Sequence, residues 1–591
     1  MIVIANNNHW KNLKRLDLGY NEIGDKGAEA IASNETWTCL ECLDLSRNSI
    51  SDTGATRIGK NRVWVNLKHI SLESNQIGDS GALIILENAV WKNLEELYLF
   101  ENNLSTAFAD ELETKNIWST WKNLKVLIFR IGNSEIQSLL NTEDNQVTHI
   151  SINSQGLNDS DAIVIGKMKN WTNLNELALP MNKIGDNGAF SIGSNTLWIN
   201  LEILDLQGNE IGNVGSLAIG NNTTWHYLQV LGLDRNRIGN EGARAIGSNT
   251  TWKNLKELYL NENTIGDEGA VSIGSNTSWT NLEKLYLWMN NIGDRGAVAI
   301  GKNTTWTNLT ELFLNQNRIG DESAVSIGEN KSWINLEVLC LQQNEIGDKG
   351  AIAIGKNTTW RNLKVLYLHA NKIGNEGAIS IGENTTWTNL EKLCLYENEI
   401  GDKGAIAIGC NTTWSKLREL ELGTNLISDE GVVSIGSNTS WINLEVLNLR
   451  QNEIGNNGAI SIGSNTTWRN LKELYLDQNR IGDEGGELIG SNTAWINLEK
   501  IYLYENEIGD KSAIAIGKNT TWTNLMELFL NQNRIGDEGA VSIGSNKSWI
   551  NLEKLYLYEN KIGDKGAIAI GKNTTWTNLM ELFLNQNRIG D

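Results

Sequence analysis

The chain has 591 residues, of which 40% are hydrophobic and 20% charged, and its formal net charge of −21 makes it strongly acidic. Nucleic-acid phosphates are bound by clustered Lys and Arg, so we expect no nucleic-acid partner and favour a basic protein partner. No apolar stretch reaches the roughly 20 residues that a membrane-spanning helix needs, and we expect no membrane partner.

The chain opens with MIVIANNNHW, which has no basic segment and no adequate apolar run. We therefore expect no signal peptide and a cytoplasmic location. A repeat begins in the same stretch, because Trp10, Trp37, Trp64 and Trp91 follow one another at a constant step. A repeat array lets a chain of this length avoid one oversized core, and we predict a first regular stretch over residues 1–105.

The period breaks over residues 106–157. One unit is longer than the regular repeat and the next is shorter, Gly132 and Gln155 stand where other units have Asn, and Asp144 replaces the Trp. We predict an irregular seam or hinge inside a single array. Over residues 158–591 the constant step returns without a slip.

Each regular unit predicts one strand. In LEKLYLWMN, Leu285 and Leu287 alternate with Lys284, Tyr286 and Trp288, which is the period-2 pattern of a half-buried strand. The leucines are expected to point into the core and the other three side chains to point outward.

The rest of the unit predicts an inward turn and a short helix. We expect a buried Asn290 to satisfy backbone groups of its own and the adjacent repeat. Asp294 suits the N-cap of a helix and Gly301 its C-terminal stop. Two helical turns are marginal alone, so the helix should depend on a shared core that includes Trp306, with Gly296 letting adjacent helices approach closely.

Twenty-two copies of the L-x-x-L-x-L pattern, most of them followed by N-x-I-G-D-x-G-A or a close variant, carry a family resemblance. The pattern resembles the leucine-rich repeat family, specifically its ribonuclease-inhibitor and GALA-like subtypes. This resemblance implies an α/β solenoid of about 22 repeats, with a parallel sheet on the concave face and short helices on the convex face. Residues 1–105, 106–157 and 158–591 are then N-terminal, irregular and regular 27-residue leucine-rich repeats. The Trp and the repeat length depart from those subtypes.

Two columns of charged residues alternate in sign from repeat to repeat. One column reads Glu322, Lys349, Glu376, Lys403 and Glu430, and the other reads Arg318, Glu345, Lys372 and Glu399. We expect ion pairs along each unit and between neighbouring units on the convex side. Each exposed pair is worth about 0.2–1 kcal/mol, but their regular alternation would penalise slippage by one repeat.

No catalytic or metal-binding pattern is evident. The five cysteines have no framework spacing, the Cys39–Cys42 pair lacks a second pair, and the five histidines occupy unrelated repeat positions. Carboxylates recur in every repeat, which is typical of architecture. We therefore predict a protein that is not an enzyme and needs no cofactor or metal.

Asn-x-Ser/Thr sequences recur in the loop between helix and strand, at Asn222, Asn249, Asn276, Asn303 and Asn357 among others. They would be glycosylation acceptors in a secreted protein. Alternatively, Asn, Ser and Thr satisfy local backbone groups in this loop.

The outward strand positions are the candidate binding residues, because Tyr and Trp offer large contact areas at low entropic cost. The predicted partner-binding set is Tyr286, Trp288, Tyr367, His369, Tyr396, Arg450, Tyr502, Tyr504, Tyr556 and Tyr558. The alternative for the uniform tyrosine positions is strand propensity and cross-strand stacking.

By resemblance, such repeats form scaffolds, inhibitors, innate sensors and bacterial effectors. We predict a non-catalytic scaffold that binds an unknown protein on its concave face. The alternatives are a GTPase-activating or other regulatory protein and a surface adhesin with glycosylated repeats. The last strand, LMELFL, is as apolar as an interior strand, so we also expect a longer array or weak self-association through the C-terminal end.

Overall fold

The computed structural model describes residues 10–88, 90–99, 102–105, 126–128, 147–154 and 156–590. Two compact units make up the chain, an N-terminal unit (Met1–Thr264) and a C-terminal unit (Ile265–Asp591). Most of the predicted irregular segment, residues 106–157, lies outside the described residues. None of the helices in the described parts has the length and apolar character that a bilayer crossing requires.

The N-terminal unit contains two runs of short parallel strands. The first run is β1 (Arg15–Asp17), β2 (Cys42–Asp44), β3 (His69–Ser71), β4 (Glu96–Tyr98) and β5 (Val126–Ile128). The second is β6 (His149–Ser151), β7 (Glu176–Ala178), β8 (Ile203–Asp205), β9 (Val230–Gly232) and β10 (Glu257–Tyr259). Its helices are α2 (Gly24–Ala32), α3 (Asp52–Gly59), α4 (Asp79–Leu86), α7 (Asp159–Gly166), α8 (Asp186–Gly193), α9 (Asn213–Gly220) and α10 (Asn240–Gly247).

The C-terminal unit is one continuous run of parallel strands with a helix after each strand but the last. The strands are β11 (Lys284–Tyr286), β12 (Glu311–Phe313), β13 (Val338–Cys340), β14 (Val365–Tyr367), β15 (Lys392–Cys394), β16 (Glu419–Glu421), β17 (Val446–Asn448), β18 (Glu473–Tyr475), β19 (Lys500–Tyr502), β20 (Glu527–Phe529), β21 (Lys554–Tyr556) and β22 (Glu581–Phe583). The helices are α11 (Asp267–Gly274), α12 (Asp294–Gly301), α13 (Asp321–Gly328), α14 (Asp348–Gly355), α15 (Asn375–Gly382), α16 (Asp402–Gly409), α17 (Asp429–Gly436), α18 (Asn456–Gly463), α19 (Asp483–Ser491), α20 (Asp510–Lys518), α21 (Asp537–Gly544) and α22 (Asp564–Gly571).

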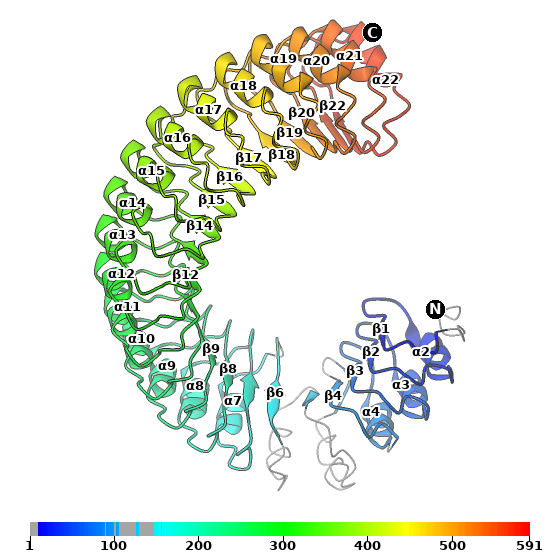
Figure 1. Cartoon of the computed structure of the whole chain (residues 1–591). Helices are drawn as coiled ribbons and strands as arrows, with labels where there is room; N and C mark the ends of the chain where they lie inside the picture. The colour runs from blue at the N-terminus through cyan, green and yellow to red at the C-terminus, as the bar shows by residue number, and fades with distance from the viewer. Residues whose placement is uncertain are drawn as a thin grey trace. The chain divides into compact units, whose positions relative to one another are not determined.

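Strand register in the C-terminal unit follows the sequence repeat. Leu285 pairs with Leu312, and Tyr286 pairs with Phe313, each at the equivalent position of the next repeat. Within this unit the strands line the inner, concave side of a curved stack and the helices lie on its outer side (Figure 1). The predicted α/β solenoid, with a parallel sheet on the concave face and short helices on the convex face, is confirmed. Its curvature follows because strands stack at about 4.8 Å, whereas helices need roughly 8–10 Å.

The core lies between the strand layer and the helix layer. In the repeat that contains β11 and α12, Leu285, Leu287, Ala297, Ile300 and Trp306 are all fully buried. The predicted burial of the Trp column is confirmed for the members from Trp37 onward that the structure describes, whereas Trp10 is exposed. These large side chains give each two-turn helix the apolar contacts that it lacks on its own.

The predicted role of the inward asparagine is confirmed. Asn290 is buried, and its Oδ1 accepts a hydrogen bond from the Ile265 backbone N–H of the preceding repeat at 2.9 Å. Its Nδ2 donates to the Leu287 carbonyl of its own strand at 3.1 Å. One side chain therefore holds the turn of its own repeat and fixes it to the preceding repeat.

The predicted N-cap role of Asp294 is wrong. The N-cap of α12 is Gly293, and Asp294 is the first residue of the helix. Its Oδ1 accepts hydrogen bonds from the backbone N–H groups of Gly320 at 2.8 Å and Ser323 at 3.3 Å. The next helix begins beside Asp294, so this carboxylate caps the neighbouring repeat and interacts favourably with the positive end of that helix.

The glycines of the helix serve close packing. Gly296 is confirmed in this role, since an added Cβ would lie 2.7 Å from the Ala270 Cβ. Gly301 is the last residue of α12, as predicted, but it does not have the positive φ of a left-handed C-cap glycine. A Cβ at Gly301 would lie 2.7 Å from the Ile327 backbone nitrogen. The neighbouring helix backbone occupies that space.

Ion pairs between neighbouring repeats are present in the second of the two predicted charge columns. Lys372 Nζ lies 3.4 Å from Glu345 Oε2, and the same column joins Arg534 Nη1 to Glu507 Oε2 at 3.0 Å. All four side chains are largely exposed, so each pair contributes little to stability and acts mainly on register.

Candidate partner-binding face

The concave face of the C-terminal unit carries two outward columns of side chains. The tyrosine column is Tyr286, Phe313, Cys340, Tyr367, Cys394, Glu421, Asn448, Tyr475, Tyr502, Phe529, Tyr556 and Phe583. The variable column, two positions later in each repeat, is Trp288, Asn315, Gln342, His369, Tyr396, Gly423, Arg450, Asp477, Tyr504, Asn531, Tyr558 and Asn585. All ten predicted binding residues belong to these two columns, and all ten are half-buried.

The tyrosine column forms a stacked row near the C-terminal end of this face. The Tyr475 and Tyr502 rings stack with centroids 4.5 Å apart and planes 8° apart. Phe529 lies 4.6 Å from Tyr502 and 4.2 Å from Tyr556 in the same row. A continuous aromatic row of this kind stabilises the sheet through cross-strand contacts.

The tyrosine hydroxyls are bound by glutamates of the same sheet. Tyr475 donates to Glu473 Oε2 of its own strand at 2.5 Å. Tyr502 has Lys500 in that position and donates instead to Glu527 Oε2 of the next strand at 2.5 Å. Each of these two hydroxyls thus reaches whichever repeat supplies the Glu.

The lysines of the same strands complete this network. Lys500 Nζ lies 3.0 Å from Glu473 Oε1, and Lys554 Nζ lies 3.2 Å from Glu527 Oε1. The polar ends of the tyrosine column are therefore already paired within the protein. This arrangement favours a structural role for the column.

The Tyr556 hydroxyl gives a pH-dependent prediction. Burial, together with the hydrogen bond to Glu581, raises the pKa of Tyr556 to about 12. The folded state therefore keeps this proton more tightly than the unfolded state. The linked stability is present below about pH 10, the ordinary tyrosine pKa, and is lost as the pH rises through 12.

Alkaline titration followed by tyrosinate absorbance should show a late component that Tyr556→Phe removes. Glu581→Gln removes the carboxylate and should move that component to lower pH. A Tyr556→Phe titration that superimposes on the unaltered protein above pH 10 would contradict this assignment.

A group of ionisable residues interrupts the aromatic row at β14–β16. Cys394 Sγ lies 3.3 Å from His369 Nδ1, and Lys392 Nζ lies 5.3 Å above the Tyr367 ring. Burial and the nearby Glu421 charge raise the pKa of the Cys394 thiol, while burial lowers the pKa of His369. A protonated thiol beside a neutral imidazole is not an activated nucleophile. Within the described ranges no cluster of three His, Cys, Asp or Glu side chains could hold a metal ion.

The variable column brings several predicted residues together. A Cβ at Gly423 would lie 2.8 Å from Arg450 Cγ and 3.1 Å from Tyr396 Cδ2, so both side chains lean over this glycine. Arg450 Nε lies 3.5 Å from Asp477 Oδ2, and Tyr504 follows on the next strand. Trp288 lies at the other end of the unit, separated from this group by β12–β14.

Gly423 and Asp477 were absent from the predicted set. Both occupy the same repeat position as the predicted Trp288, Tyr396, Arg450, Tyr504 and Tyr558. The sequence does contain signals that could identify them. One is a glycine, which leaves this column without a side chain at one repeat, and the other is a single carboxylate within the column. The aromatic criterion did not include either residue type.

The Asn-x-Ser/Thr positions belong to the scaffold. Asn303 is 5% exposed, and its Nδ2 donates to the carbonyls of Gly274 at 2.9 Å and Asn276 at 2.8 Å. A glycan attached at this nitrogen would replace one of its two N–H hydrogens, so at least one of these hydrogen bonds would be lost. The structure therefore favours the loop interpretation of these sequences.

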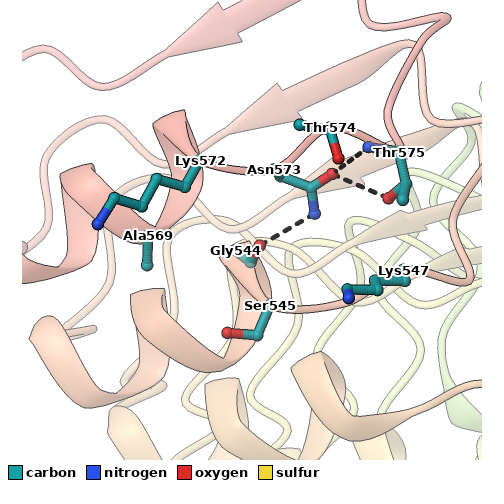
Figure 2. Close-up of a pocket in the computed structure, with 8 residues that line it drawn as sticks. All are labelled: Gly544, Ser545, Lys547, Ala569, Lys572, Asn573, Thr574 and Thr575. Atoms are coloured by element: carbon teal, nitrogen blue, oxygen red, sulfur yellow. Dashed lines mark hydrogen bonds between the residues drawn. The ribbon is translucent and has the colours of Figure 1, made fainter.

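Figure 2 shows the equivalent Asn573. Its Nδ2 donates to the Gly544 carbonyl at 2.9 Å, and its Oδ1 accepts from the Thr575 N–H and hydroxyl at 2.8 Å each. The residues around it line a surface depression of about 360 Å³ that also includes Lys547 and Lys572. A similar depression recurs around Asn519, so it arises from helix stacking and is not unique to one site.

Comparison with known proteins agrees with this geometry. The sequence profile described as Leucine Rich repeat matches residues 11–32, 38–59, 65–85, 172–193, 199–220, 226–247, 253–274, 280–301, 307–328, 334–355, 361–382, 388–409, 415–436, 442–463, 469–490, 523–544 and 550–571. The chain belongs to the leucine-rich repeat family. A search of curated proteins found no match.

Solved structures share the fold. The chain is similar to the plant peptide hormone receptor RGFR1 in complex with RGF2, with 22% identity over 98% of this chain and 91% of the other and a TM-score of 0.50. It is similar to PEPR1 in the PEPR1–AtPEP1 structure, with 19% identity over 90% and 74% and a TM-score of 0.51. The Arabidopsis receptor kinase HAESA ectodomain, in complex with an extended IDA peptide hormone, gives 18% over 98% and 87% and a TM-score of 0.50.

Proposed function

We propose that the chain is a non-catalytic scaffold whose protein partner lies against the concave face of the C-terminal unit. The observation that carries this proposal is the contrast between adjacent repeat positions. The residue before the variable column, represented by Leu287, is leucine in every repeat of this unit. The variable column itself contains Trp, Asn, Gln, His, Tyr, Gly, Arg and Asp.

Packing in the core explains why the position before the variable column is always leucine, but it does not explain the variety of residues in the variable column. The leucines are fully buried through β21, whereas most members of the variable column are half-buried and face the concave side. The tyrosine column beside it is occupied by its own stacking and hydrogen bonds. The variable column is therefore the surface on which repeats differ and to which a partner can respond.

Two further observations support a polypeptide partner, and specifically a basic one. RGFR1 is a peptide hormone receptor and the HAESA ectodomain is in complex with a peptide hormone, and a polypeptide partner is proposed here too. The net charge of −21 favours a basic polypeptide. No observation favours a GTPase-activating protein or a glycosylated adhesin over this scaffold.

The proposal also includes two more specific points. The repeats are proposed to be of the ribonuclease-inhibitor or GALA-like subtype, and the protein is proposed to be cytoplasmic. Weak self-association through the C-terminal end also stays a prediction.

The test removes large side chains from the variable column. Trp288→Ala, Tyr396→Ala, Tyr504→Ala and Tyr558→Ala combined should reduce capture of partner proteins from extracts of the producing cells by about tenfold or more, since aromatic anchors carry most interface energy.

The matched control removes four exposed isoleucines from the loop after the Trp. These are Ile334, Ile442, Ile496 and Ile550, which are 53%, 55%, 50% and 54% exposed. Their combined alanine variant should capture the same proteins as the unaltered chain. Equal loss in both variants, or retention in both, would overturn concave-face binding, provided that thermal unfolding is unchanged.

A further inference from the structure

One stretch of the variable column repeats nowhere else in the C-terminal unit. Gly423, Arg450, Asp477 and Tyr504 follow the consecutive strands β16 to β19, and Tyr396 follows β15. We call these five residues the Arg450–Asp477 cluster. It is the only place in the described column where a cation and a carboxylate occupy neighbouring repeats.

The carboxylate of this cluster is buried and incompletely paired. The Asp477 side chain is 1% exposed, and its Oδ2 accepts no hydrogen bond from any residue that the structure describes. The Nε of Arg450 is likewise buried without an acceptor among the described residues. These two atoms lie 3.5 Å apart, too far for a good hydrogen bond. Burying an acceptor and a donor in this way is costly, which makes the pair a strong candidate for completion by a ligand.

Arg450 is the half of the pair that can move. Its side chain is 35% exposed, and Nη2 makes a long hydrogen bond of 3.3 Å to Gln478 Oε1. Its aliphatic stem rests over Gly423, where no side chain blocks it. Burial raises the pKa of Asp477, and the Tyr504 hydroxyl and the Arg450 charge oppose this shift. The Asp477 carboxylate therefore needs nearby hydrogen-bond donors or positive charge to stay ionised.

The cluster fits a ligand that offers an acceptor and a donor side by side. A lone carboxylate would pair with Arg450 but be repelled by Asp477, and a lone ammonium would meet the opposite conflict. A peptide group presents C=O and N–H on adjacent atoms and satisfies both side chains.

We propose that the Arg450–Asp477 cluster binds a main-chain amide of an extended segment of the partner protein. Arg450 donates to the C=O of that amide and Asp477 accepts from its N–H. Tyr396 and Tyr504 border the site along the stack, roughly 19 Å apart at four strand spacings of about 4.8 Å each. That span suits an extended segment of several residues. This inference rests on the proposed function and names the ligand group that the same face recognises.

The test uses a display library of linear peptides selected on the intact chain. The tightest peptide is then resynthesised with each main-chain amide N-methylated in turn, which removes one N–H at a time. One N-methylation should weaken binding to the unaltered chain by about tenfold or more, as expected for a hydrogen bond to a charged group. The same N-methylation should cost less on Asp477→Asn, because the amide oxygen of Asn accepts only a neutral and therefore weaker hydrogen bond.

Protein variants complete the test. Arg450→Met keeps the aliphatic stem over Gly423 and should weaken binding of the parent peptide by about tenfold or more. The matched control is Arg361→Met at an exposed loop position, which should bind as the unaltered chain does. Circular dichroism and thermal unfolding verify that each variant is folded.

Each outcome separates this inference from the proposed function. Stronger binding by Asp477→Asn would indicate a carboxylate ligand and overturn the inference. Peptides that lose affinity with Trp288→Ala or Tyr558→Ala, but not with Arg450→Met or Asp477→Asn, would overturn it while leaving concave-face binding intact. Peptides that depend on no concave residue would count against both. Failure of the library to yield any binder would exclude a linear segment as the occupant.

Discussion

Replacing Asn533 with leucine should lower the free energy of unfolding by about 3–5 kcal/mol. Asn533 is buried, and its Oδ1 accepts from the Ile508 N–H of the preceding repeat at 3.0 Å. Its Nδ2 donates to the carbonyls of Leu503 at 2.9 Å and Leu530 at 3.1 Å. Leucine makes none of these bonds, so one buried N–H and two buried carbonyls lose their partner.

Urea unfolding followed by Trp fluorescence measures the loss, and hydrogen exchange of β19 and β20 locates it. The matched control is Asn551→Leu, because Asn551 is only half-buried and its side chain donates a hydrogen bond of 3.0 Å to the Thr523 carbonyl at an exposed position. Its effect should stay within about 0.5 kcal/mol. Equal destabilisation by the two substitutions would show that the inward position has no special role.

The sequence predicts the parts of the fold that follow from one repeat alone. Alternation around Leu285 and Leu287 identifies the strand, and the constant repeat length requires the in-register pairing that is observed. Burial of Trp306 follows because a two-turn helix otherwise has too little apolar surface.

The sequence predictions that differ from the structure concern contacts between repeats. Asp294 is placed like an N-cap residue in its own sequence, but the N–H groups it accepts from belong to the next helix. Gly301 stands at the end of its helix, where a C-cap glycine is expected. The close approach of the Ile327 backbone is the better explanation for glycine at this position. Local sequence cannot reveal which repeat supplies a partner until the direction and spacing of stacking are known.

For the candidate site too, the sequence predicts the position of each residue within its repeat but not its contacts with neighbouring repeats. Period-2 alternation correctly placed Tyr502 and Tyr504 on one face of the sheet, but it did not distinguish their surroundings. The Glu and Lys residues that alternate at the first strand position determine which repeat binds each hydroxyl, as Lys500 and Glu527 show for Tyr502. This rule can be read from the sequence only once the register is known.

Replacing Gly328 with alanine should lower the free energy of unfolding by about 1–3 kcal/mol, the usual cost of overpacking. Gly328 ends α13, and a Cβ there would lie 2.5 Å from both the Ala353 carbonyl carbon and the Ile354 nitrogen of α14. These are backbone atoms of a packed helix, so the two helices must separate. Because separation is passed along the stack, hydrogen exchange should accelerate in α13 and α14 before more distant repeats respond.

Gly571 supplies the matched control, since it ends α22 at the same repeat position and a Cβ there would meet no described heavy atom within 4 Å. Gly571→Ala should leave stability unchanged or raise it by up to about 1 kcal/mol, because alanine has the higher helix propensity. Urea midpoints of the two variants therefore should move in opposite directions or differ clearly in size. If Gly328→Ala proved as stable as Gly571→Ala, close helix packing would not be what requires glycine at this position. The alternative would be a conformational need, but Gly328 does not have the positive φ that would require glycine there.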